Sequence, residues 1–495
     1  MPDDVLVALA QEIEARNMLV AYEIFLNRQR ELNQLPSTPL LVDCLARLLD
    51  RTTDYKEMVV NRLSRLPASI EHTVEESMRL LLARGVVALH EERYQESMQR
   101  LEVVRALADE HAHEGLRLVS RYYLARAFYK SGNYHAALDT ASEARGICGQ
   151  KQPRILALIE MVRAWVLFVQ GSDEAEAALE SAESVFKGGD YLEEANIASF
   201  RGRLLSHRAE HDDAIRLYRE AIAHFERGSA FQHPNLARTY VHLAFSALSR
   251  ARQIAKAPRT PGGNDQGMSY RAEADTCLNL AAKMLPQNTG DRVARLLYVR
   301  ALWCLDSGRP SACRTTLAEA ESKCSQGAVL RAHILIMRCR CNDYAGISEA
   351  QRALQLAEQG GSRRLQARAR ACLGMCYLRN GSETAIAQEC LRKGRGDLTA
   401  TNLDYVRDEL DELETELQAA LRANGIVVST LTEQEVRNLG YQKSLDKVKR
   451  EIVSHFLRNH GDSVSQVAVE LQSDSRTLRR ALGSALGSSK QESEA

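Results

Sequence analysis

The residues whose types and spacing best suit a chemical task lie near the C-terminal end of this 495-residue sequence. Arg476, Arg479 and Arg480 recur at helical spacing, so their side chains project from one side of a helix, with Ser475 and Thr477 beside them. Arginine forms paired hydrogen bonds with guanine edges, and basic side chains bind DNA phosphates in a salt-dependent manner. These five residues are therefore the predicted DNA-binding residues.

The elements that must position these arginines are two short helices joined by a tight turn. Residues 443–459 carry apolar residues at helical spacing and would form a supporting helix. Ser463 and Gln466 have the spacing of a capping box that begins the next helix, and Ala468 is small where two helices cross. Leu478 would seat the arginine-bearing helix on this core. The layout is that of a helix-turn-helix, whose second helix enters the DNA major groove.

The electrostatic case for DNA is local, because the whole chain has a formal net charge of zero. Between residues 443 and 482 there are eight Lys and Arg residues against five Asp and Glu residues. This modest positive excess follows an acidic stretch. It favours a nucleic-acid interface at the end of the chain rather than along its whole length.

Residues 460–482 resemble, without a gap, the Fis-type helix-turn-helix that ends many bacterial enhancer-binding regulators. The resemblance implies dimeric binding to inverted-repeat DNA, often together with the alternative sigma-54 polymerase. That second implication transfers poorly, because the required ATPase would need a G-x-x-x-x-G-K-[ST] phosphate loop, and the sequence contains none. The matching residues are His460, Gly461, Val464, Ser465, Ala468, Leu471, Arg476, Thr477, Leu478, Arg480 and Leu482.

Three positions depart from the pattern of that family. Gln472 replaces the turn glycine and would have to adopt a positive φ at some cost. Ser473 replaces the usual core isoleucine, and Ser475, preceded by Asp474, replaces the arginine expected at the start of the reading helix. These changes are compatible with an altered DNA preference or with a degenerate module that now binds protein.

The spacing of residues does not indicate a catalytic, cofactor-binding or metal-binding site. The sequence has no H-E-x-x-H, no G-x-S-x-G and no glycine-rich dinucleotide loop, so it predicts no catalytic residue, cofactor or enzymatic activity. The 11 cysteines include no C-x-x-C pair. Cys372 and Cys376 share a helix face, but that face also supplies the core. Buried free thiols in a reducing compartment are therefore expected, and no metal site is predicted.

Composition and repeats predict an all-α protein. Proline is scarce, at 10 residues, and the strong helix formers Ala, Leu, Arg and Glu dominate. Residues 121–144 resemble the tetratricopeptide repeat, a two-helix unit of about 34 residues. Leu124 and Phe128 line the first helix, and Ala125 and Ala137 are small where the two helices cross. Gly132 would make the turn between them.

The same pattern recurs about eight times over residues 73–396, which predicts a TPR-like α-solenoid followed by the small C-terminal helix-turn-helix domain. Residues 1–72 read as short helices that cap the first repeat. One repeat is interrupted at residues 257–268, which are rich in proline and glycine. Such an insertion is either a functional loop or a disordered segment, and disorder is the favoured interpretation.

An acidic helix follows the repeats within residues 397–425. Its apolar residues alternate at spacings of three and four, so it either caps the array or forms a dimerising stalk. Asn424 and Gly425 would end it. Residues 430–487 then form the helix-turn-helix domain, and residues 488–495 form a flexible tail. The alternating apolar residues of the acidic helix, called its seam below, are Leu403, Val406, Leu410, Leu413, Leu417 and Ala420.

No basic leader and no long uncharged run is present, so the sequence predicts a cytoplasmic protein without a membrane span. The leading hypothesis is a bacterial transcriptional regulator, for which the Fis-type resemblance implies a homodimer. Its repeat array would bind a protein or peptide signal, and its C-terminal module would bind double-stranded DNA. The alternative is a non-enzymatic interaction scaffold whose helix-turn-helix no longer binds DNA.

Overall fold

The computed structural model describes residues 2–423 apart from short gaps, and beyond them only residues 449, 469 and 477. The described part contains 21 α-helices, one 3-10 helix and no strand. The predicted fold class, an all-α TPR-like solenoid, is confirmed. The gaps lie at residues 53, 67–71, 149–151, 228–232, 257–262, 286–289, 325–327, 382 and 399–403.

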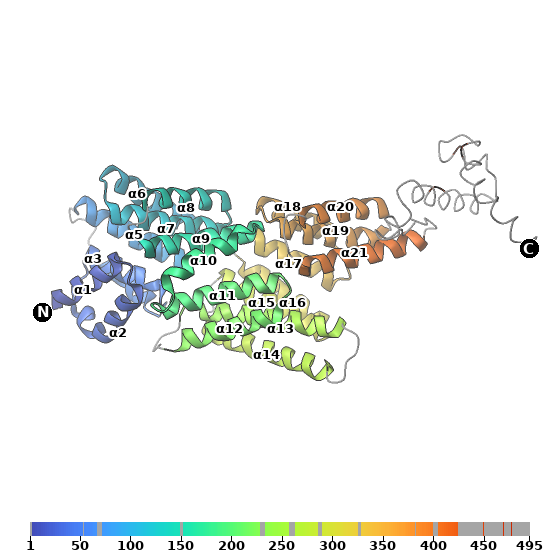
Figure 1. Ribbon diagram of the computed structural model, residues 1–495, viewed down its shortest axis with the longest axis horizontal. Coiled ribbons are helices and arrows are strands. Elements are labelled where there is room, and N and C mark those ends of the chain that lie inside the picture. Colours follow the sequence, from blue (N-terminus) through green and yellow to red (C-terminus); the bar gives the residue numbers. More distant parts are fainter. Residues whose placement is uncertain are drawn as a thin grey trace, which may run out of the picture.

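The array consists of consecutive helix pairs stacked side by side, from the N-terminal helices at one end to α21 at the other (Figure 1). In the described residues, α5 to α20 make eight such pairs. The first helices of the pairs are α5 (Val74–His90), α7 (Glu114–Ser131), α9 (Pro153–Gln170), α11 (Tyr191–His207), α13 (Leu236–Lys256), α15 (Gly290–Asp306), α17 (Ala328–Cys341) and α19 (Arg363–Gly381). The second helices are α6 (Tyr94–Glu110), α8 (Tyr134–Cys148), α10 (Glu174–Phe186), α12 (His211–Glu226), α14 (Gly263–Met284), α16 (Pro310–Lys323), α18 (Ile347–Gln359) and α20 (Thr384–Leu398).

The first helices form the inner layer of the array. Successive first helices contact one another, as α7 contacts α9, α13 contacts α15, and α17 contacts α19. In a curved stack of two layers, the layer whose members approach most closely lies on the inside of the curve. The curvature also brings distant repeats together, because α19 contacts α9.

The α7–α8 pair shows why this sequence folds as a repeat. Gly132 ends α7 in the left-handed region, with φ of 87°, and so turns the chain without a side-chain clash. Leu124, Ala125 and Ala137 are buried where the two helices cross, as their spacing predicts, and Phe128 is half-buried. The small alanines permit close helix packing, and the larger residues fill the space between pairs.

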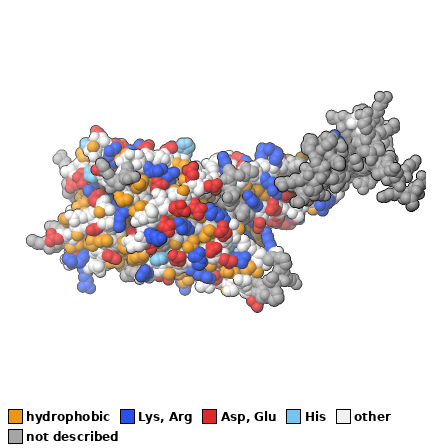
Figure 2. Space-filling model, viewed as in Figure 1, with side chains coloured by type: hydrophobic (Ala, Val, Ile, Leu, Met, Phe, Trp, Pro, Cys, Tyr) orange, Lys and Arg blue, Asp and Glu red, His pale blue; other side chains and the backbone are white. Residues whose placement is uncertain are grey.

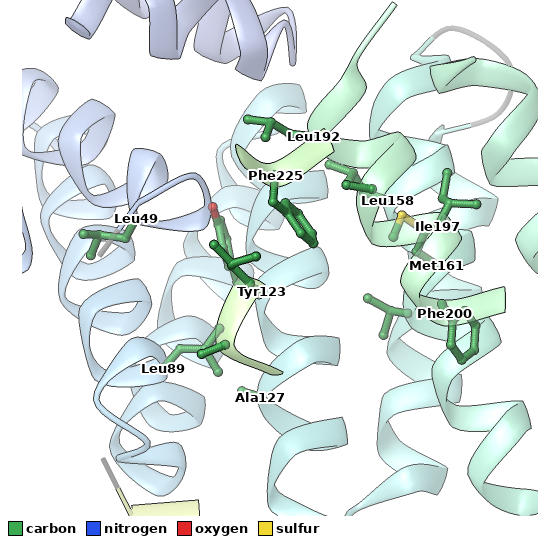
Figure 3. Close-up of a cluster of buried hydrophobic side chains, with 14 of the residues drawn as sticks. Leu49, Leu89, Tyr123, Ala127, Leu158, Met161, Leu192, Ile197, Phe200 and Phe225 are labelled. Atoms are coloured by element: carbon green, nitrogen blue, oxygen red, sulfur yellow. The ribbon is translucent and has the colours of Figure 1, made fainter. Parts of the chain in front are cut away.

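Four short helices precede the array. They are α1 (Pro2–Glu14), α2 (Met18–Gln34), α3 (Pro39–Arg47) and α4 (Lys56–Arg65), with the 3-10 helix η1 (Leu48–Asp50) after α3. Helix α3 packs on α5, the first helix of the array. Leu49 of η1 lies in the same buried cluster as Leu89 of α5 and Tyr123 of α7 (Figure 3).

Buried ion pairs tie the end of η1 to helices much later in the chain. Arg51 bonds to Asp190, which precedes α11, at 2.8 Å, and both side chains are 2% exposed. Asp50 accepts hydrogen bonds from Tyr123 at 2.8 Å and from Arg126 at 2.7 Å. Burial alone would raise the pKa of Asp50, but Arg126 and His90 hold it well below its usual range. The N-terminal unit therefore contacts the array as far along as α11, beyond the first repeat.

Helix α14 begins at Gly263, so part of the segment predicted as a disordered insertion at 257–268 is helical. That part of the prediction is wrong, because residues 263–268 extend the helix that packs against α13. Residues 257–262 lie outside the described residues.

Helix α21 (Asp404–Ala423) packs on α19 and α20. Its seam residues Val406, Leu410, Leu413 and Leu417 are each at most 2% exposed. Because this apolar face is buried against helices of the same chain, it is not available to pair with a second copy. The dimerising stalk, which was the alternative interpretation, is therefore excluded for these residues. Leu403, Asn424 and Gly425 lie outside the described residues.

Charged residues also join α21 to the array. Glu409 accepts hydrogen bonds from Arg368 of α19 at 2.8 Å and from Arg340 of α17 at 3.1 Å. Burial alone would raise the pKa of Glu409, but the two arginines lower it. The acidic character of this helix thus has a structural role at this position.

The predicted helix-turn-helix at 430–487 and the tail at 488–495 lie outside the described residues, except for residues 449, 469 and 477. All 11 cysteines are buried free thiols, as predicted. In the part of the chain that is described, no helix combines the length and the apolar character needed to cross a bilayer.

The packing of α21 can be tested at Gly374 of α19. A Cβ atom at this position would lie 2.7 Å from Leu413 Cδ2 and 3.3 Å from Cys390 Cβ. We expect Gly374→Ala to lower the free energy of unfolding by about 1–3 kcal/mol, measured by urea denaturation, because the added methyl group overpacks this contact.

Gly146→Ala is the matched control. Gly146 lies in α8, and a Cβ there would have no neighbour within 4 Å. This change should leave stability unchanged or raise it by up to about 1 kcal/mol. Equal effects of the two substitutions would contradict the packing described for α21.

Candidate functional site

The inner layer carries a group of basic side chains contributed by four different helices. Lys130 lies near the end of α7, Arg203 on α11, Arg238 on α13 and Arg295 on α15. Arg295 is exposed, and the other three are half-buried. We call these four residues the inner cationic cluster.

Burial and neighbouring cations both oppose the charges of Lys130 and Arg238. Burial and then the positive charges of Arg238, Arg292 and other arginines lower the pKa of Lys130 well below its usual value. Burial and then Arg203 lower the pKa of Arg238 to about 9. Within the described residues, none of the four forms an ion pair with a carboxylate; the neighbouring Arg292 does, with Glu92 at 3.7 Å. The fold thus holds unneutralised positive charge in one place, which costs stability unless an anion binds.

Two of the four cations lie against aromatic rings. Arg203 lies over the Phe168 ring of α9, with its Cζ 4.9 Å from the ring centre, and this contact orients the guanidinium. Lys130 lies in the last turn of α7, where the helix dipole favours a positive charge, and its Nζ is 5.7 Å from the Tyr129 ring centre.

Neutral polar and aromatic groups surround the cluster. Tyr129 and Trp165 are half-buried, and their rings lie 5.8 Å apart. Burial alone would raise the pKa of Tyr129, but Arg203 and Arg238 lower it. Burial and then Arg203 lower the pKa of His242 well below its usual value, so this imidazole is neutral at pH 7. Tyr129, Trp165 and His242 can add hydrogen bonds and apolar contact to an anion held by the cations.

The last repeat also reaches this region. Arg364 of α19 lies with its Nη1 2.6 Å from Nε2 of His207, one turn after Arg203 on α11. Burial and then Arg364 lower the pKa of His207 well below its usual value. The inner surface near the cluster is therefore formed by helices from both halves of the array.

The face of the molecule shown in Figure 2 has a different charge pattern, because basic and acidic side chains are interleaved on it. Many of the exposed arginines are paired, as Arg216 is with Asp213 at 3.1 Å on α12. Such pairs are solvated and contribute little to binding. The inner cationic cluster differs because its charges have one sign and are partly withdrawn from water.

Of the predicted DNA-binding residues, the structure describes only Thr477. Thr477 is helical and exposed. Ser475, Arg476, Arg479 and Arg480 lie outside the described residues. The inner cationic cluster was not predicted from the sequence. A signal was present, since Arg203 with His207 and Arg238 with His242 repeat the same basic spacing of four on successive inner helices.

No protein-family model matches the chain, and no curated protein does. Among solved structures, the chain is similar to the apo form of the quorum sensor NprR from B. thuringiensis, with 14% identity, a TM-score of 0.32 and coverage of 80% of this chain and 98% of that chain. It is also similar to the human IFIT1 dimer with m7Gppp-AAAA, with 16% identity, a TM-score of 0.37 and coverage of 87% and 90%. At these values the likenesses carry no ligand or function over to this chain.

Because of the repulsion within the inner cationic cluster, we expect Arg238 to destabilise the fold. Arg238→Gln should raise the free energy of unfolding in urea by about 1 kcal/mol, because it removes a partly buried charge that repels its neighbours. Arg216→Gln, at an exposed pair on α12, is the control and should change stability by less than about 0.5 kcal/mol. A loss of stability in Arg238→Gln would contradict the unneutralised state of the cluster.

Proposed function

We propose that this chain is a non-enzymatic, cytoplasmic regulator whose repeat array binds an acidic peptide or protein segment on its inner layer. Residues 430–487 would then bind double-stranded DNA as the output module. The observation that carries the proposal is the inner cationic cluster of Lys130, Arg203, Arg238 and Arg295, whose positive charge is not neutralised by carboxylates of the described residues. A ligand carboxylate would supply the missing negative charge.

A peptide suits this surface better than a small inorganic anion. The four cations come from α7, α11, α13 and α15, so a ligand that meets all of them must contact four inner helices. An extended segment with several carboxylates can contact them in succession, since its backbone advances about 3.3 Å per residue. Half-buried Tyr129 and Trp165 would pack against its apolar side chains.

DNA binding is proposed from the sequence. Its support is the helix-turn-helix pattern of residues 460–482 and the basic side chains Arg476, Arg479 and Arg480. The competing proposal is an interaction scaffold, which the substitutions at Gln472, Ser473 and Ser475 would favour. Dimeric binding, as in the Fis-type family, would need a contact outside the buried seam of α21.

Ligand binding can be tested with the full chain and fluorescein-labelled peptides. A pool of acidic ten-residue peptides should bind more tightly than a neutral pool, and the affinity should fall as salt increases. Arg203→Gln combined with Arg238→Gln should weaken binding at least tenfold, since two charge-assisted contacts are lost. Arg216→Gln should bind as the unchanged chain does. Equal binding of both pools, or unchanged binding by the double variant, would reject the proposed site.

DNA binding can be tested with the full chain and a pool of random-sequence duplexes by fluorescence anisotropy. The logarithm of the binding constant should fall linearly with the logarithm of the salt concentration. On a duplex selected from the pool by the full chain, Arg476→Ala and Arg479→Ala should each weaken binding by about 1–3 kcal/mol, because each removes a base contact. A chain ending at residue 425 serves as the control without the module. No DNA affinity at low salt in the full chain would favour the scaffold.

A further inference from the structure

Three cysteines that are distant in the sequence meet inside the last repeats. Cys339 lies on α17, and Cys372 and Cys376 lie one turn apart on α19. Their sulfur atoms all lie within 4.8 Å of one another, and the residues are 0%, 4% and 0% exposed respectively. Two facing helices therefore present three thiols to a single point.

The spacing of the sulfurs matches that of a metal-thiolate centre. With metal–sulfur bonds of about 2.3 Å, ligand sulfurs lie about 4 Å apart in trigonal or tetrahedral geometry. Each sulfur also has a directional contact that orients it. Cys339 and Cys376 both donate toward the Gly346 carbonyl oxygen, at 3.4 Å and 3.8 Å, and Cys372 donates toward the Ile336 carbonyl oxygen at 4.0 Å.

We propose that Cys339, Cys372 and Cys376 bind one thiophilic metal ion, of the Cu(I) class, through three thiolates. Soft sulfur ligands select such ions. A structural zinc site would need a fourth ligand. In the described part of the chain, however, no histidine or carboxylate joins the three sulfurs within the same 4.8 Å. A three-coordinate ion is satisfied by the cysteines alone.

A metal ion binds cysteine in its thiolate form. Coordination through all three thiolates therefore displaces the three thiol protons to water.

The proposed ion would join α17 to α19 beside the contact with α21. Arg340 directly follows Cys339, and Arg368 lies one turn before Cys372. Both arginines bond to Glu409 of α21. An ion at the cysteines would therefore fix the two helices on which α21 is seated. This site is independent of the proposed peptide and DNA interactions.

The test uses the full chain, reduced and freed of metal, and Cu(I) supplied from a competing chelator. We expect one ion per chain by elemental analysis, sulfur-to-metal charge-transfer absorption in the ultraviolet, and three sulfur ligands by X-ray absorption. Cys339→Ser, Cys372→Ser and Cys376→Ser should each weaken binding at least tenfold. Cys390→Ser is the matched control, since Cys390 is buried in the same hydrophobic core, and it should bind as the unchanged chain does.

Alkylation keeps the proposal testable if the serine variants fail to fold. Cu(I) should protect Cys339, Cys372 and Cys376 of the unchanged chain from iodoacetamide during partial denaturation, without equal protection of Cys390. Binding far below one ion per chain, equal protection of Cys390, or a disulfide formed among the three cysteines in place of metal uptake would overturn the proposal.

Discussion

The close approach of the inner helices is the constraint on which the rest of this structure depends. Helix pairs can stack with a curve only if one layer packs more tightly than the other, and small residues make this possible. Within one pair, Gly202 on α11 shows the same use of a small residue, because a Cβ there would lie 2.8 Å from the Tyr218 ring of α12. The curvature brings α19 to α9 and places Arg364 beside His207. Residues more than 150 positions apart thereby share one surface.

This same packing creates an electrostatic cost. Burial and mutual repulsion oppose the charges of Lys130 and Arg238, whereas the buried cations at either end of the array are neutralised, Arg51 by Asp190 and Arg368 by Glu409. The chain thus places carboxylates beside structural arginines and leaves the inner cationic cluster without them. A stable fold gains nothing from such an arrangement, but a receptor for an anionic ligand does, because ligand binding recovers the electrostatic cost.

The sequence was sufficient for the fold class because each repeat encodes its own local packing. Leu124, Ala125 and Ala137 could be assigned to the interior from spacing alone. The apolar seam of α21 was visible too, but its spacing fits packing on the array and packing on a second chain equally well. The inner cationic cluster could not, since Lys130 and Arg295 meet only through the curvature of several repeats. The three cysteines show the same limit: Cys372 and Cys376 share a visible helix face, but Cys339 joins them from another repeat. Residues 263–268 were predicted to be disordered but are helical, because packing of α14 on α13 outweighs their weak helix propensity.

Calorimetry of the thermal unfolding of the full chain can show whether the unneutralised cations of this fold bind anions. Thermal unfolding would be compared in citrate and in chloride at equal ionic strength, for the unchanged chain and for Arg203→Gln with Arg238→Gln. The account predicts that citrate raises the Tm of the unchanged chain, because a ligand that binds only the folded state stabilises it, and that the double variant loses most of this increase. An equal increase in both proteins, or none in either, would contradict the account.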